Sequence, residues 1–359
     1  MRSKKSAGER PLRPGDVVEV KSAAEILATL DADGALDNMP FMPEMARHAG
    51  RRYTVWRRVD KACNTVDMSG SRRMHETVYL DDLRCDGSGH GRCQAACRIY
   101  WKEAWLRRVD DSAGSPVAHN GQAVELERLA LAGTRAAGPS GDEREQWRCQ
   151  ATEALKASEH LKRSYLSQYW REFRNGNFRP LRFLALLARG FVMEVGFEIG
   201  LVKALPLKGS GSPPSPAQPP SLRPGDLVRV RPAAEIKATL DETGFNRGLS
   251  FDREMLPFCG KTFRVKANVD QIIDEETGRM LKIPKDSIVL DGPGCSGLRS
   301  IGRWFCARDG YPFWREAWLE RVEEPDGASV KPLRVGGSAP EDSMPSIRGS
   351  CSAASSQSE

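Results

Sequence analysis

Residues 12–31 read LRPGDVVEVKSAAEILATLD, and residues 222–241 read LRPGDLVRVRPAAEIKATLD. Fifteen of these twenty aligned positions are identical, at a constant offset of 210 residues. The correspondence returns where WKEAWLRRV at 101–109 answers WREAWLERV at 314–322. Chance does not place two such pairs in one chain. The sequence therefore predicts a tandem duplication of one structural module.

Each copy has the pattern of a small module rich in β-strands. A Pro-Gly-Asp turn precedes a short alternating strand, marked by Val18 and Val20 in the first copy and by Val228 and Val230 in the second. A short helix follows, and further strand-like segments lead to the Trp-rich closing segment. Short strands separated by turn residues in this way favour a small β-barrel with a short helix inserted after its first strand. The opening and closing segments resemble SH3-like barrels such as that of the nitrile hydratase β-subunit.

The segment between the copies has a helical pattern. Apolar residues at close to helical spacing predict an amphipathic helix over 143–174, which Asn175-Gly176-Asn177 would end. A second, strongly apolar helix is expected to begin at Pro180 and to cover about 181–205. We therefore expect an α+β fold class, with two SH3-like small β-barrel repeats flanking a helical middle region.

The second helix is not expected to span a membrane. It contains Arg189, Glu194 and Glu198, and a charge at the centre of a bilayer costs about 2.5–3.5 kcal/mol. Basic residues nevertheless outnumber acidic ones around its start. A peripheral membrane contact through 160–205 therefore stays open as an alternative.

Composition shifts set the expected boundaries. The Gly/Ser/Pro-rich run PLKGSGSPPSPAQPPS is typical of a linker, and the polar, small residues after Glu323 are typical of disorder. The expected segments, in chain order, are a disordered start at 1–10, repeat 1 at 11–110, a loose linker at 111–142, the helical region at 143–205, a linker at 206–221, repeat 2 at 222–323 and a disordered tail at 324–359.

The bulk composition is that of a globular protein. Of the 359 residues, 40% are hydrophobic and 28% are charged. The formal net charge of +6 is spread over many residues, so it is only a weak hint of anionic partners. The N-terminal stretch has basic residues but no apolar run, so we expect no secretory signal and a cytoplasmic location. In a reducing compartment, the nine cysteines are more often metal ligands or reactive thiols than disulfides.

The sharpest local signal is the stretch CDGSGHGRCQAAC at 85–97. It places four metal-ligand side chains within thirteen residues: Cys85, His90, Cys93 and Cys97. Zinc takes thiolate and imidazole ligands tetrahedrally, and four protein ligands make a closed, structural site. Cys63 is a candidate extra ligand if its strand runs alongside. An iron–sulfur cluster is the rival, because the same residue types also bind iron.

The second copy keeps only part of this cluster. Cys295 answers Cys85, and Cys306 answers Cys93 across a three-residue insertion, whereas Gly310 stands where Cys97 stood. Two ligands do not make a zinc site, so only the first copy is predicted to bind metal.

Three cysteines are candidate reactive thiols. Cys149 opens the predicted central helix, and a helix N-terminus lowers the pKa of a thiol. Cys295 and Cys306 are either a buried pair or a thiol couple. No HExxH, GxSxG, P-loop or dinucleotide-binding pattern is present in the sequence, which leans against an enzyme without deciding the question.

Taken together, the paired RPGD openings, CDGSGHGRCQAAC, RCQATEAL and the closing WKEAWL and WREAWLERV segments resemble a family of bacterial tandem-repeat proteins. The resemblance covers nearly the whole chain apart from its tails. Members look like companions of polysaccharide or natural-product biosynthesis genes, and no activity is established for them. The resemblance therefore implies an accessory role in the bacterial cytoplasm and supplies no mechanism.

These observations predict a non-catalytic, metal-binding interaction protein. Two barrels would flank the helical region, a structural zinc ion would stabilise the first, and the assembly would bind another protein. One alternative is a redox enzyme that uses an iron–sulfur cluster or a reactive thiol. The other is a nucleic-acid-binding protein, which is disfavoured because the chain has no dense Lys/Arg stripe interleaved with exposed aromatics.

Overall fold

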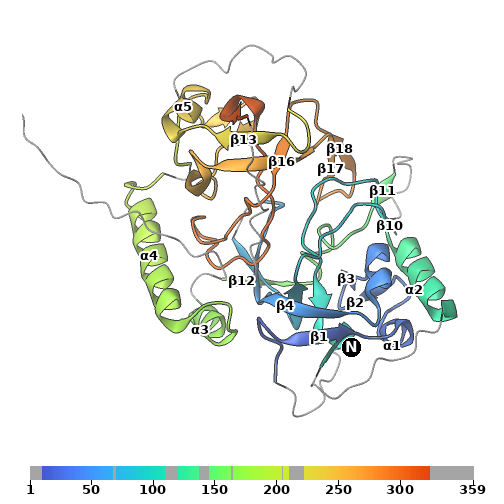
Figure 1. The fold of residues 1–359 in the computed structure, drawn as a ribbon. Coiled ribbons are helices and arrows are strands. Elements are labelled where there is room, and N and C mark those ends of the chain that lie inside the picture. Colours follow the sequence, from blue (N-terminus) through green and yellow to red (C-terminus); the bar gives the residue numbers. More distant parts are fainter. Residues whose placement is uncertain are drawn as a thin grey trace, which may run out of the picture.

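The structure is a computed structural model, and it describes seven stretches of the chain (Figure 1). These are residues 10–67, 70–109, 120–136, 145–162, 165–203, 205–209 and 222–323. Most of the expected terminal segments and of the Gly/Ser/Pro linker lie outside the described residues. Within them the fold is α+β, with several small antiparallel sheets and few helices.

Repeat 1 is built around one antiparallel sheet with the strand order β8-β7-β4-β1-β9. Its elements are β1 (Val17–Val20), α1 (Ala23–Leu27), β2 (Ala35–Leu36), β3 (Met39–Pro40), the 3-10 helix η1 (Pro43–His48), β4 (Arg52–Arg58), β5 (Lys61–Cys63), β6 (Ser71–Arg73), β7 (Thr77–Leu80), β8 (Trp101–Lys102), η2 (Glu103–Trp105) and β9 (Leu106–Arg108).

Repeat 2 follows the same order, with a central sheet β19-β16-β13-β20. Its elements are β13 (Leu227–Val230), α5 (Ala233–Ala238), β14 (Phe245–Asn246), β15 (Leu249–Ser250), η3 (Leu256–Phe258), β16 (Thr262–Asn268), β17 (Gln271–Ile273), β18 (Met280–Lys282), β19 (Ile288–Leu290), η4 (Glu316–Trp318) and β20 (Leu319–Arg321). The match extends to a local irregularity, because the register shifts at Val55 in β4 and at the equivalent Val265 in β16.

The expected closed barrel is not seen in the described residues. Each central sheet has open edges, and the hairpin β5–β6, which follows β4, forms a separate sheet with another strand instead of extending the main one. In repeat 2, β17–β18 also lies outside the central sheet and forms a two-stranded sheet of its own. The hairpin that could have closed each sheet is thus used elsewhere in the molecule.

The closing tryptophans fill the cores of the two repeats, as the sequence suggests. Trp105 and Trp318 are fully buried, and each meets a phenylalanine edge-on, Phe41 at 5.2 Å and Phe251 at 5.4 Å between ring centroids. Because a buried indole N–H needs a partner, Trp105 donates to the hydroxyl of Thr29 at 3.1 Å. Trp318 donates to the equivalent Thr239 at 2.9 Å.

The middle region differs from its prediction. It contains α2 (Asn120–Gly133), β10 (Arg135–Ala136), β11 (Gln146–Trp147), β12 (Glu159–Leu161), α3 (Ser167–Arg174) and α4 (Pro180–Glu198). The expected helix over 143–174 is wrong except for its last two turns, which form α3. Residues 146–161 instead form strands and turns, because β12 pairs with β6 of repeat 1 and satisfies its backbone groups there.

Two further differences concern the neighbouring segments. The stretch expected as a loose linker contains α2, which packs on α1 and η1. The second helix begins at Pro180, as predicted, and ends at Glu198, earlier than expected. Gly200 follows in a left-handed conformation, with φ of 77°, which ends the helix. Among the described residues, no helix is both long and apolar enough to cross a membrane.

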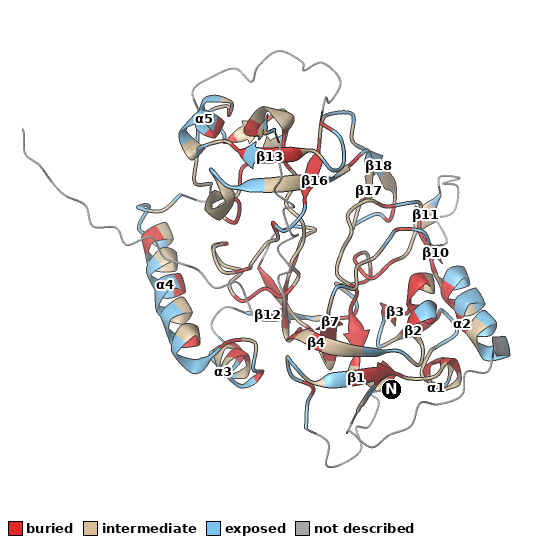
Figure 2. Ribbon diagram, viewed as in Figure 1, coloured by how far each residue is buried: buried red, intermediate tan, exposed pale blue. Residues whose placement is uncertain are grey.

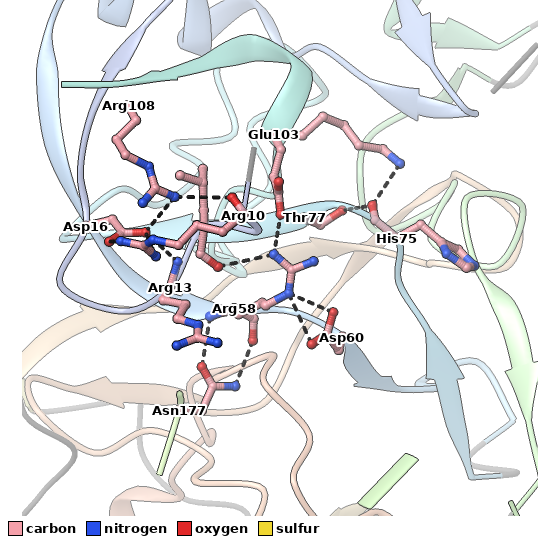
Figure 3. Close-up of polar contacts among 12 residues, drawn as sticks. Arg10, Arg13, Asp16, Arg58, Asp60, His75, Thr77, Glu103, Arg108 and Asn177 are labelled. Atoms are coloured by element: carbon pink, nitrogen blue, oxygen red, sulfur yellow. Dashed lines mark hydrogen bonds and ion pairs between the residues drawn. The ribbon is translucent and has the colours of Figure 1, made fainter. Parts of the chain in front are cut away.

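Polar contacts dock the α3–α4 turn onto repeat 1 (Figure 3). The guanidinium of Arg58 lies between the carboxylates of Asp60 and Glu103 and also donates to the carbonyl of Leu12 at 3.2 Å. Asn177, in the turn between the helices, accepts from the backbone N–H of Arg58 and donates to its carbonyl, both at 2.9 Å. Glu103 of the closing segment therefore has a structural partner.

The repeats contact each other through exchanged hairpins. Hairpin β17–β18 of repeat 2 reaches the cysteine-containing loop between β7 and β8 of repeat 1 (Figure 1). There the N–H of Gln94 donates to the carbonyl of Gln271 at 3.1 Å. The N–H of Ile273 donates to the sulfur of Cys93 at 3.3 Å.

The β5–β6 hairpin of repeat 1 makes the same two contacts with the loop of repeat 2. The N–H of Ala307 donates to the carbonyl of Lys61 at 3.0 Å. The N–H of Cys63 donates to the sulfur of Cys306, also at 3.0 Å. Because the contacts are reciprocal, the interface has the isologous form of a two-fold symmetric dimer within one chain.

The equivalent positions Thr65 and Glu275 meet at the pseudo-two-fold axis, where the hydroxyl of Thr65 donates to the Glu275 carboxylate. Arg308 completes this contact by donating to Thr65 at 2.6 Å and to Glu275 at 2.7 Å. The two repeats thus form one unit with a half-buried polar centre.

Candidate metal centre

The loop between β7 and β8 of repeat 1 is equivalent to the loop between β19 and η4 of repeat 2. Both loops are closed at the base by the same backbone hydrogen bond. The N–H of Cys85 donates to the carbonyl of Cys97 at 2.8 Å, and the N–H of Cys295 donates to the carbonyl of Gly310 at 2.9 Å. The loop backbone is therefore a property of the fold, and it forms with or without the full cysteine set.

Gly87 is required by the tight reversal of this loop. Its φ is +73°, and a Cβ there would overlap the carbonyl oxygen of Cys93 and lie 2.7 Å from the amide nitrogen of that residue. The equivalent Gly297 has a φ of +67° and the same close approach to Cys306. Only glycine adopts this conformation without steric cost.

Three ligand side chains converge under the loop of repeat 1. They are Glu44 from η1, and Cys85 and His90 from the loop, and their ligand atoms all lie within 4.8 Å of one another. The sulfur of Cys85 is 3.8 Å from Nε2 of His90. For zinc–sulfur and zinc–nitrogen bonds of about 2.3 and 2.0 Å, a tetrahedral ion holds these two atoms about 3.5 Å apart. The spacing is therefore close to that of two ligands on one ion.

The polar atoms of this cluster are buried without ordinary partners. Glu44 is 5% exposed and His90 is 2% exposed. Neither carboxylate oxygen of Glu44, nor Nδ1 of His90, has a hydrogen-bond partner among the described residues. An unpaired buried carboxylate is costly, so such a group in a folded protein calls for a ligand.

Repeat 2 provides an internal comparison, because Glu254 occupies the place of Glu44. The carboxylate of Glu254 accepts five hydrogen bonds from the cysteine-containing loop of repeat 2. The donors are the N–H and hydroxyl of Ser296, the N–H of Arg299, and the N–H and hydroxyl of Ser300. In repeat 1, Asp86 and His90 stand at the positions of the two serines. The hydroxyl donors are thus replaced by an acid and an imidazole, and Glu44 is left facing Cys85 and His90.

The electrostatics of the cluster follow from burial. Burial lowers the pKa of His90 to about 4, so its imidazole is neutral and free to bind a cation at neutral pH. Burial raises the pKa of Cys85 well above its usual value and also raises the pKa of Glu44. A bound cation would supply the positive charge that favours the ionised forms of both groups.

The structure brings together two of the four residues predicted from spacing, Cys85 and His90. Cys93 and Cys97 do not belong to the group of three within the described residues. The sulfur of Cys93 instead faces repeat 2, where it accepts from Ile273. Cys97 is half-buried, and its removal from water raises the pKa of its thiol to about 11.

The candidate extra ligand, Cys63, lies in the other of the two reciprocal contacts, where the β5–β6 hairpin meets the loop of repeat 2. Its thiol interacts with Cys306 of repeat 2, and this hydrogen bond raises the pKa of Cys63 and lowers the pKa of Cys306 to about 6. Burial raises the pKa of Cys295 well above its usual value. Of the two repeat 2 cysteines considered as reactive thiols, Cys306 is therefore the one whose pKa is lowered.

Cys149 does not begin a helix. It lies after β11, and its N–H donates to the hydroxyl of Thr152 at 2.9 Å. Burial raises the pKa of Cys149 to about 12. The thiol therefore stays protonated at neutral pH, contrary to the helix N-terminus argument for its reactivity.

Glu44 is the residue that reasoning from cysteine spacing missed. The available signal was the repeat itself, because Glu44 and Glu254 are identical at the same offset as the opening segments. The glutamate is identical in both repeats, whereas the residues of the loop that it faces differ. This difference indicates that the carboxylate has a different partner in each repeat.

No protein-family model matches the chain, and neither the curated proteins nor the solved structures contain a significant match.

Proposed function

We propose that the chain is a non-catalytic binding protein whose first repeat is stabilised by a structural zinc ion. The observation that carries this proposal is the contrast between Glu44 and Glu254. The same buried carboxylate receives five hydrogen bonds in repeat 2, whereas in repeat 1 its oxygens have no hydrogen-bond partner within the described part of the chain and face the thiol of Cys85. A cation bound to Glu44, Cys85 and His90 would supply the missing interaction.

Zinc fits this ligand set better than an iron–sulfur cluster. One thiolate, one imidazole and one carboxylate are ligands that zinc accepts together. Iron–sulfur clusters are held chiefly by several cysteine thiolates, and the cluster of three contains one. The neutral His90 also supports a borderline cation such as zinc.

The burial of the site supports a structural role over a catalytic one. Glu44 and His90 are almost completely buried, and neither of the two described cavities is lined by a member of the cluster. Three protein ligands leave a fourth position on a tetrahedral ion, which water or a neighbouring group of the loop would fill.

In this proposal, the metal maintains a loop that is also part of the repeat interface, since Gln94 and Cys93 contact hairpin β17–β18. Metal binding would therefore stabilise the docking of the two repeats, and the resulting rigid unit would present its binding surface elsewhere. An accessory role in the cytoplasm, beside a biosynthetic enzyme, remains the expectation that the family resemblance adds.

The test is the metal content and visible spectrum of the purified full-length protein. We expect one zinc per chain and no colour. His90→Ser, which installs the repeat 2 residue, should abolish zinc retention, whereas His160→Asn on the exposed strand β12 should retain it. A brown protein that releases sulfide, or zinc that is unaffected by His90→Ser, would overturn the proposal.

A further inference from the structure

A large cavity lies between the helices α3 and α4 and the body of the molecule, far along the chain from the metal cluster. Its volume is about 1130 Å³. One wall is α4, another is α3, a third is the tip of the repeat 2 loop at Gly302 and Trp304, and the floor is the small sheet β12-β6-β5. The cavity is thus built from both repeats and the middle region.

The α4 wall is apolar and unusually exposed. Five apolar residues recur along one side of the helix and its last turn: Leu184, Ala188, Phe191, Val195 and Ile199. Phe191 is 65% exposed and Ile199 is 63% exposed. Much of α4 is coloured as exposed in Figure 2. At 1.5 Å per residue, this stripe is about 22 Å long. Exposed apolar surface of this extent on a folded chain marks a binding site.

The floor of the cavity carries three buried polar side chains. Lys61 of β5 and Gln168 of α3 are paired, since the ammonium donates to the amide oxygen at 2.9 Å. Ser71 of β6 is 5% exposed, and its hydroxyl has no hydrogen-bond partner among the described residues. Mostly apolar walls with a few convergent polar groups are typical of small-molecule sites. The unpartnered hydroxyl points to a polar ligand atom above the floor.

The charges around the cavity indicate how a ligand would be oriented. Lys61 supplies a positive charge at the floor, where its ammonium also lies over the ring of Tyr169, 5.6 Å from the centroid. Buried Glu172 lies close enough to Lys61 to feel its charge. The two acidic lining residues, Glu194 and Glu198, belong to the C-terminal half of α4. An anionic head group is therefore favoured beside Lys61 and disfavoured beside Glu194 and Glu198.

We propose that this cavity binds a single-chain anionic amphiphile, namely a long-chain fatty carboxylate. The carboxylate would accept hydrogen bonds from the Lys61 ammonium and the Ser71 hydroxyl. The acyl chain would lie along the apolar stripe of α4, whose length suits an extended tail. The ligand would thereby cover the exposed apolar surface, which neither repeat covers by itself.

The direct test is binding of palmitate to the full-length protein, measured by calorimetry, with hexadecanol as the uncharged comparison. Palmitate should bind in a 1:1 ratio and more tightly than hexadecanol. Lys61→Met should weaken palmitate about 10–100-fold, the usual effect of losing a hydrogen bond to a charged group, and should leave hexadecanol nearly unchanged. Ser71→Ala should weaken palmitate about 5–10-fold.

Two α4 variants separate the cavity from the rest of the helix. Ala188→Trp should fill the cavity and block binding, whereas Leu181→Asn, at an exposed α4 position outside the lining, should bind like the parent protein. Equal affinity for palmitate and hexadecanol together with no effect of Lys61→Met or Ser71→Ala would overturn the proposal. A concentration-dependent dimer or binding to phosphatidylcholine vesicles, in a protein that does not bind palmitate, would also overturn it and would assign the α4 surface to a second copy or a membrane.

Discussion

The matched glutamates of the two repeats allow the metal proposal to be tested by stability. In repeat 2, Glu254→Gln converts one carboxylate oxygen into an NH2 group. The amide oxygen of the new side chain can keep the three hydrogen bonds that Oε1 of Glu254 now accepts. The NH2 group then replaces Oε2 and faces the N–H and hydroxyl of Ser296, which can no longer donate to this position. Hydrogen bonds to a charged group contribute about 1.5–3 kcal/mol each, so the substitution should cost about 3–6 kcal/mol.

Glu44→Gln should behave differently, because Glu44 has no hydrogen bond to lose among the described residues. In excess chelator, we expect its effect on the free energy of unfolding to be within about 1 kcal/mol, or stabilising, since a neutral amide costs less to bury than a carboxylate. With zinc present, Glu44→Gln should remove the stabilisation that the ion gives to the parent protein.

The assay is urea unfolding of the parent protein and both variants, each with added zinc and with chelator. Chelator should lower the stability of the parent and of Glu254→Gln by the same amount and should leave Glu44→Gln unchanged. If Glu44→Gln costs as much as Glu254→Gln in chelator, or responds to zinc as the parent does, the argument from unpaired carboxylate oxygens is refuted.

Three further outcomes follow from the packing and charges. Gly87→Ala should destabilise the protein by about 3 kcal/mol or more in thermal melts, whereas Gly50→Ala, with the same φ of +73° and nothing within 4 Å of a Cβ, should cost about 1 kcal/mol. Because burial raises the pKa of Glu172 to about 7 from an ordinary 4.5, this carboxyl should reduce stability progressively as pH rises from about 4.5 to about 7, by about 3 kcal/mol. Glu172→Gln should remove that part of the pH profile, and an unchanged profile would contradict the assignment. Arg308→Met should cost about 1.5–3 kcal/mol by removing the charged partner of Glu275 at the repeat interface, where Thr65 still donates to this carboxylate, and adding Glu275→Met should recover part of this loss in a double-mutant cycle.

The duplicated core was predictable because its determinants are local and occur twice. Val18 and Val228 lie in equivalent strands, and the tryptophans of the closing segments are buried, as their patterns indicate. The helix predicted over 143–174 failed because its apolar residues serve distant partners. Leu161, for example, pairs with Ser71 on a strand of repeat 1. Strand pairing over such sequence separations leaves no periodic signal in the segment itself.

In the candidate site, too, the local features were predictable from the sequence and the long-range contacts were not. Cys85 and His90 are brought together by a loop whose glycines and closing hydrogen bond are local, so their spacing was informative. Glu44 comes from a different element, and Cys93 is directed toward Ile273 in the other repeat. Neither fact can be read from the spacing of ligands within one loop, because both depend on how the elements pack.

X-ray absorption spectroscopy of the zinc-loaded, full-length protein tests the central claim most directly, because it counts the sulfur atoms bound to the ion. The account predicts one sulfur at about 2.3 Å and the remaining ligands as nitrogen or oxygen at about 2.0–2.2 Å, with the sulfur lost in Cys85→Ser. A shell of three sulfurs would contradict it and would support the ligand set of Cys85, Cys93 and Cys97 with His90. A protein that binds no zinc would contradict both.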